Sequence, residues 1–121
     1  MTEPMWIAEH AEAARDFLVE ASDAITAGKR LNAAEMLWGA AAHAIIAVAQ
    51  DRGWPFHYHR DLTSTAKNLA FEYQDWRMWD GIKAAEQCHI YFYHGRMHDG
   101  TLDDSFPLVR YLVGRLLALI N

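Results

Sequence analysis

The sequence predicts an all-α protein, an antiparallel bundle of four main helices plus a short one. Apolar residues recur at spacings of three and four along most of the 121 residues, which is the period of one helical face. No long segment alternates with period two and β-branched residues are scarce, so strands are not expected. Gly28, Gly53 and Gly100 divide the chain into segments joined by short connections, as in an up-down bundle.

The first two helices are expected over residues 5–27 and 31–51. In the first, apolar residues follow one face, acidic residues cover the other, and Gly28 fits the position just past its end. The second is rich in alanine and apolar around most of its circumference, which is typical of a central helix or of one at an interface. Its one polar strip contains Glu35 and His43.

A short third helix is expected over residues 62–73, after a connector over residues 56–60. Either Asp61 or Thr63 is expected to cap it, because both side chains can accept a hydrogen bond from the first turn.

The fourth and fifth helices complete the predicted bundle. The fourth is expected over residues 75–97, ending at residues 99–100. The fifth is expected to start at residue 104 or 105, with Pro107 in its first turn, where a missing N–H does no harm.

Composition and charge restrict the classes of function. A chain of this length forms one domain, residues 1–121, and buries roughly two-thirds of its unfolded surface. The net charge of −5 is unfavourable for wrapping DNA. The single cysteine, Cys88, allows no internal disulfide, so we expect a cytoplasmic protein. A basic leader is missing and no uninterrupted apolar run reaches the length of a membrane span, so no membrane association is expected.

Residues 84–98 contain the residue types most often used in chemistry: three histidines, the only cysteine and an aromatic run. On a helix, Glu86 and His89 fall inside the apolar arc, whereas His94 falls outside it. Burying a carboxylate and an imidazole without partners costs several kcal/mol, so we expect Glu86 and His89 to hydrogen-bond each other. Their Glu-x-x-His spacing also matches part of a di-iron site, but such a site needs a second motif of this kind and further inward carboxylates, for which Glu35 is the one candidate on the second helix. We therefore predict no cofactor and no metal site, and keep a metal-binding bundle as an alternative.

Two further histidine pairs have spacings that zinc could use. They are His57 with His59 in the connector, and His94 with His98 one helical turn apart. In a chain with seven histidines, these spacings are more often those of surface residues. We interpret Cys88 as a small packing residue, because the adjacent imidazole would point about 100° away around a helix.

Three segments resemble a known family. Residues 33–45 resemble the second helix of HEPN-type domains (higher eukaryotes and prokaryotes nucleotide-binding), most closely their archaeal, repeat-associated PaREP-type branch. Residues 57–62 and 85–93 resemble the same branch. The resemblance implies a HEPN-like antiparallel bundle that is usually a homodimer. In active members it implies metal-independent RNA cleavage by an arginine followed four to six residues later by a histidine, at the cleft between protomers.

This chain departs from the catalytic motif of that family. His94 would stand in the place of the motif histidine, but His89 occupies the position where the arginine is expected, and no arginine closer than Arg77 precedes it. Arg52 with His57 or His59 satisfies the spacing, but the pair spans a helix end and a proline-containing loop. Because a neutral imidazole cannot hold a phosphate bidentately as arginine does, we expect a member without nuclease activity.

The leading hypothesis is therefore a non-catalytic, dimeric module that binds a protein partner or a nucleotide-like ligand, in a toxin–antitoxin or stress context. The alternative is a metal-independent ribonuclease acting on RNA, with His94 and His89 as its catalytic residues. The candidate ligand-binding residues are Glu35, His43, Glu86, Tyr93 and Arg96.

Overall fold

The computed structural model describes residues 3–95 and 100–120, and these ranges are helical apart from short connections. No strand occurs within them, so the expectation of an all-α protein is confirmed. The five helices are α1 (Glu3–Thr26), α2 (Arg30–Arg52), α3 (His59–Glu72), α4 (Trp76–His94) and α5 (Thr101–Ala118).

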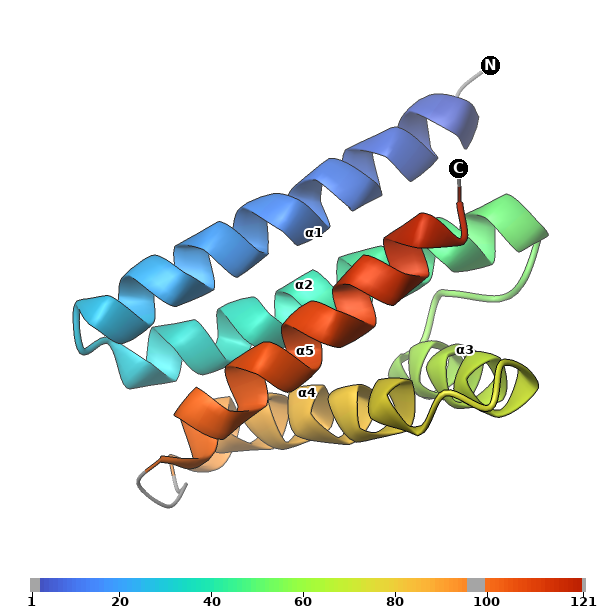
Figure 1. Ribbon diagram of the computed structural model, residues 1–121. Helices are drawn as coiled ribbons and strands as arrows, with labels where there is room; N and C mark the ends of the chain where they lie inside the picture. The colour runs from blue at the N-terminus through green and yellow to red at the C-terminus, as the bar shows by residue number, and fades with distance from the viewer. Residues whose placement is uncertain (1–2, 96–99, 121) are drawn as a thin grey trace.

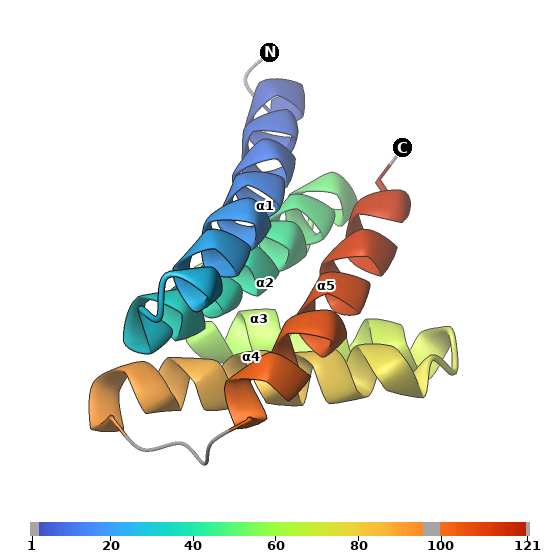
Figure 2. The same ribbon diagram turned by 60° about the vertical axis from the view of Figure 1, so that its left-hand side comes forward.

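Helix α2 is the centre of the molecule and packs against each of the other four helices. In both views α1 lies on one side of α2 and α5, and α3 and α4 lie on the other side (Figures 1 and 2). Helix α4 runs across α2 and α5 rather than alongside them, as Figure 2 shows. Much of the apolar circumference predicted for the second helix is therefore covered within one chain, although Met36, Ala42 and Ile46 are only partly buried.

Alanine and glycine determine how closely the helices approach. Helix α2 returns antiparallel to α1 after Gly28, which adopts the left-handed conformation with φ 78°, and alanines from both helices are buried where they meet. The crossing of α4 and α5 is tighter: a Cβ atom added to Gly81 would lie 2.7 Å from Leu112 Cβ and 2.8 Å from the carbonyl oxygen of Leu108. The backbones can come this close only because Gly81 has no side chain.

Helix α3 begins three residues earlier than predicted, at His59. Tyr58 is the N-cap residue, and its backbone N–H donates to Oδ2 of Asp61 at 3.1 Å. Asp61 therefore lies within the first turn and bonds back to the N-cap residue. The prediction that Asp61 or Thr63 is the N-cap is wrong. As a consequence, His59 belongs to α3 and not to the connector.

The predicted boundaries of α4 and α5 also need correction. Helix α4 ends at His94, followed by Gly95 in the left-handed conformation; the expected continuation over residues 96–97 lies outside the described residues. Helix α5 begins at Thr101, so Pro107 lies in its second turn and not in its first. There the proline removes the hydrogen bond that the carbonyl of Asp103 would otherwise accept.

By length and hydropathy alone, α2 could also cross a membrane, and it is the one described helix that meets both criteria. The sequence prediction was based only on uninterrupted apolar runs, and therefore did not identify α2 as such a helix. Of the apolar window in α2, 56% is buried inside the protein. This burial is compatible with the core helix of a soluble protein, which passes the same test.

Candidate functional site

Three aromatic rings from three different helices meet beside α2. The ring centroid of Trp38 lies 4.6 Å from that of His59 and 5.0 Å from that of His89, and the two imidazoles are 5.5 Å apart. These three distances form a triangle, so the imidazoles are neighbours and do not lie on opposite faces of the indole. Trp38 is buried and forms the floor on which both histidines rest.

Each imidazole lies beside a carboxylate. The Nδ1 atom of His89 is 3.1 Å from Oε1 of Glu35, a distance at which its N–H donates a hydrogen bond. The Nε2 atom of His59 is 3.9 Å from Oε2 of Glu86, and the Thr63 hydroxyl donates to that same oxygen at 2.9 Å. We call these six residues, Trp38 included, the histidine–carboxylate cluster.

The prediction that Glu86 and His89 hydrogen-bond each other is wrong. Both side chains do turn inward from α4, but each is satisfied by a residue of another helix, Glu86 by α3 and His89 by α2. Neither is fully buried: the side chain of Glu86 is 25% exposed and that of His89 is 27% exposed. The cluster is therefore accessible from solvent.

Helical spacing explains why these residues converge. Glu35 and Trp38 are three residues apart on α2, as Glu86 and His89 are on α4, so each pair shares one helical face. His59 is the first residue of α3. The side chains come together because α2 packs against both α3 and α4.

The structure brings some of the predicted site residues together and separates others. Tyr93 contacts the cluster, with its ring edge-on to His89 at a centroid distance of 5.1 Å. His94 is exposed in the last turn of α4, and in the described residues it makes no hydrogen bond, ion pair or ring contact with the cluster. His43 lies elsewhere on α2, and Arg96 falls outside the described residues.

Sequence reasoning missed Trp38, His59 and Thr63 as members of the cluster. The tryptophan fitted the apolar surface of the second helix, and His59 was placed in a connector because the start of α3 was set too late. A signal was present in the sequence: Tyr58 and Asp61 have the spacing of a reciprocal cap, which would have moved the start of the helix.

A second histidine pair joins α1 to α2. The Nδ1 atoms of His10 and His43 are 2.8 Å apart, so one neutral imidazole donates its N–H and the other accepts it. Phe17 stacks on His43 at a centroid distance of 5.5 Å. Burial lowers the pKa of both histidines below the ordinary value, and the proximity of His10 lowers the pKa of His43 further.

His43 is also part of the wall of a groove between α1, α2 and α4, with a volume of about 440 Å³. We call it the α1–α2–α4 groove. Its polar groups are few: the side chains of Asn32, Glu35 and His43. Its other lining residues are aromatic or small and apolar: Phe17, Met36, Trp38, Gly39, Ala42 and Phe92.

Two features of α2 give this groove its shape and charge. Gly39 leaves the helix backbone bare, and a Cβ atom there would lie 3.4 Å from the Phe17 ring. Asn32 lies in the first turn of α2, which has no side-chain cap and no acidic residue. The N–H groups of that turn lack intrahelical partners and give the helix end a positive potential.

Metal and thiol chemistry receive no support from the geometry. In the described residues, no three His, Cys, Asp or Glu side chains are arranged to hold a metal ion. Cys88 is fully buried, and burial raises the pKa of its thiol to about 11. It therefore stays protonated near neutral pH and packs in the core, as predicted.

Every residue of the cluster and of the groove falls within residues 9–113, the segment that matches the family model of the archaeal PaREP1/PaREP8 family. The likeness to the PaREP-type branch is thereby confirmed. No curated protein and no solved structure matches the chain. Because the family match extends over most of its length, the chain belongs to the archaeal PaREP1/PaREP8 family.

Proposed function

We propose that this chain is a non-catalytic helical module that binds a nucleotide-like ligand in the α1–α2–α4 groove. The observation that carries this proposal is the groove itself. Its volume of about 440 Å³ lies within the usual range for small-molecule sites. Its mostly apolar lining with a few polar groups is also typical of such sites. A flat heteroaromatic base would pack against the aromatic rings of Phe17 and Phe92.

The polar groups of the groove match the two ends of such a ligand. The carboxylate of Glu35 would accept hydrogen bonds from amino or ring N–H groups of a base, and the amide of Asn32 can both donate and accept. A phosphate would lie toward the first turn of α2, where free backbone N–H groups provide positive potential. His89 holds Glu35 in position from the other side.

Titration calorimetry of the chain with purine and pyrimidine nucleoside monophosphates tests this proposal. Gly39→Leu would fill the groove and abolish the heat of binding. Circular dichroism checks that this variant stays folded, because a Cβ atom at Gly39 lies 3.4 Å from the Phe17 ring. Gly114→Leu is the matched control, because Gly114 is an exposed helical glycine with open space around it. If wild type binds no nucleotide, or if Gly39→Leu binds as well as Gly114→Leu, the proposed function is wrong.

The same proposal includes a HEPN-like arrangement of the helices, a cytoplasmic location and a homodimer. Large side chains beside the cluster support the dimer: Tyr58, Ile90 and Tyr93 are 63%, 55% and 68% exposed. A second copy covering them would bring two clusters close together. Light scattering during size-exclusion chromatography measures the mass directly, and a monomer at all concentrations would exclude the dimer.

A metal-independent ribonuclease is the second candidate, and one observation favours it. Two imidazoles 5.5 Å apart, each beside a carboxylate, have the composition of a general acid–base pair. A phosphate-binding arginine is missing from the described part of the cluster, which is why this function ranks second.

Incubating RNA with wild type and with single His→Ala variants tests the nuclease. Cleavage that is lost in both His59→Ala and His89→Ala, and retained in His94→Ala, would favour the cluster as the catalytic site. Equal background in all four proteins would end this alternative.

A further inference from the structure

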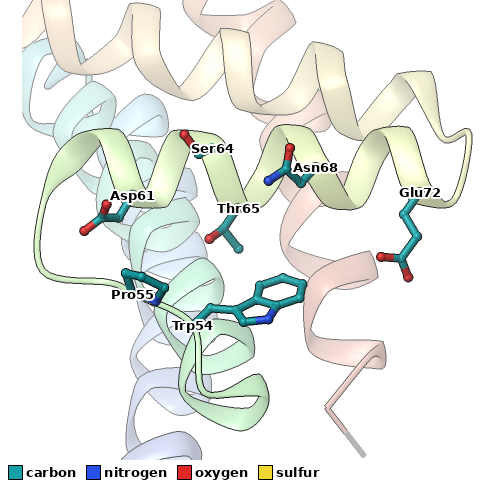
Figure 3. Close-up of a pocket in the computed structure, with 7 residues that line it drawn as sticks. All are labelled: Trp54, Pro55, Asp61, Ser64, Thr65, Asn68 and Glu72. Carbon is teal, nitrogen blue, oxygen red and sulfur yellow. The ribbon is translucent and has the colours of Figure 1, made fainter.

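A separate hollow lies between α3 and the segment that follows α2, with a volume of about 360 Å³. Figure 3 shows Trp54 and Pro55 on one side and the polar face of α3 on the other. That face contributes two carboxylates, two hydroxyls and one amide: Asp61, Ser64, Thr65, Asn68 and Glu72. This polar face is the solvent side of α3, because the buried residues Leu62, Ala66 and Leu69 lie on another face of the helix.

The Trp54 indole forms the aromatic wall of the hollow. It is held in place by Arg52, the last residue of α2. The guanidinium of Arg52 lies 5.2 Å from the centroid of the Trp54 ring, and it donates to the Tyr73 hydroxyl at 3.1 Å. Arg52 also lies 3.8 Å from a Glu72 oxygen. These contacts limit the movement of the indole and of the adjacent carboxylate, so the wall is preorganised.

The charges of the hollow exclude two classes of ligand. Two carboxylates and one guanidinium leave it with a net negative charge, which repels phosphates and other anions. The hollow also binds a single ammonium group poorly, because the two carboxylates lie at opposite ends of the polar face and each already has a partner. Asp61 accepts from the backbone N–H of Tyr58, and Glu72 faces Arg52.

Neutral donors and acceptors line the α3 side of the hollow between the two carboxylates. Ser64, Thr65 and Asn68 can each donate and accept hydrogen bonds, and Thr65 points toward Trp54 (Figure 3). Such a set suits a neutral ring that has hydroxyl groups at its edge and an apolar C–H face to lay on the indole. We propose that this hollow binds a sugar ring, such as a neutral pyranoside or furanoside.

Saturation-transfer NMR on the full chain tests the proposal with methyl glycosides of glucose, galactose, mannose and ribose as probes. Spermidine and inorganic phosphate serve as cationic and anionic comparisons. We expect saturation transfer to at least one glycoside, with shifts of the Trp54 indole N–H signal, and no shift of that signal with phosphate.

Asn68→Asp keeps the shape of the side chain but replaces the amide donors with a third carboxylate, and we expect about tenfold weaker glycoside binding. Gln87→Glu is the matched control, because Gln87 is an exposed glutamine on α4 that lines neither this hollow nor the α1–α2–α4 groove. Circular dichroism confirms that both variants are folded. The proposal is overturned if no glycoside binds, if only spermidine shifts the Trp54 signal, or if the two variants bind glycoside equally well.

Discussion

The imidazole of His89 and the carboxylate of Glu35 form a hydrogen bond of 3.1 Å that connects α4 to α2. About a third of the Glu35 side chain is exposed, so solvent weakens the attraction between the two groups. The bond nevertheless fixes the carboxylate between the histidine–carboxylate cluster and the α1–α2–α4 groove. Glu35 therefore belongs both to the groove proposed for ligand binding and to the cluster proposed for acid–base catalysis.

The first prediction concerns the energy of this contact. In a double-mutant cycle of Glu35→Ala, His89→Ala and the double variant, we expect a coupling free energy of about 0.5 kcal/mol, because partly exposed pairs contribute little. Urea unfolding measures the four stabilities. A coupling near zero would show that the pair does not form in solution.

The second prediction concerns the crossing of α4 and α5. Gly81→Ala places a Cβ atom 2.7 Å from Leu112 Cβ and 2.8 Å from a backbone carbonyl, so the helices must separate. We expect a loss of about 2–3 kcal/mol in the free energy of unfolding. In Gly114→Ala the new methyl group meets nothing within 4 Å, and the better helix propensity should stabilise by about 0.5–1 kcal/mol. Equal urea midpoints for the two variants would contradict the close crossing.

The third prediction concerns pH and the pair of His10 and His43. Both pKa values are lowered in the folded state from an ordinary value of 6.5, so the unfolded chain binds more protons in the window below pH 6.5. Acidification through that window therefore lowers the free energy of unfolding. The stability that the two neutral histidines contribute is fully present above pH 6.5. Glu9 opposes the effect by raising the pKa of His10.

His43→Gln removes one of the two titrating groups while keeping a polar side chain. We expect its urea midpoint to fall less than that of wild type between pH 7.5 and pH 5.5. His57→Gln, which changes an exposed connector histidine, should keep the wild-type dependence. An unchanged pH dependence in His43→Gln would assign the effect to other groups.

The helices were predictable because periodicity and turn residues are local signals. The apolar circumference of α2 correctly indicated a central position, and the inward direction of Glu86 and His89 followed from helical spacing alone. Their partners did not, because which helix lies beside α4 depends on packing over the whole chain. Glu35 is 54 residues from His89, and no local pattern specifies that pairing.

Errors at helix ends had the largest effect on the predicted site. Placing the start of α3 three residues late moved His59 into a connector and hid one of the two imidazoles. The start of α5 was set late for a similar reason, because Pro107 was assumed to belong to the first turn. Pro107 is exposed in the second turn, whereas the buried face of α5 packs against α4 and α2.

The fourth prediction concerns Asp75, which joins the start of α4 to α5. Its side chain accepts from the backbone N–H of Met78 at 3.2 Å, from the Tyr111 hydroxyl at 2.7 Å and from Arg115 Nε at 3.0 Å. Burial alone would raise the pKa of Asp75, but these hydrogen bonds outweigh it and lower the pKa below the ordinary value of 3.8. The stabilisation from Asp75 is therefore fully present above about pH 4 and is lost as the pH falls further.

Asp75→Ala removes the helix cap and both contacts to α5, so we expect a loss of about 2 kcal/mol in the free energy of unfolding at pH 7. Asp80→Ala, an exposed position on the same helix, should change stability by less than about 0.5 kcal/mol. Below pH 3 the difference between Asp75→Ala and wild type should shrink, because protonation removes the charge that strengthens the bonds to Arg115 and Tyr111. A difference that stays constant from pH 7 to pH 2.5 would mean that packing, and not the ionised carboxylate, accounts for the stabilisation.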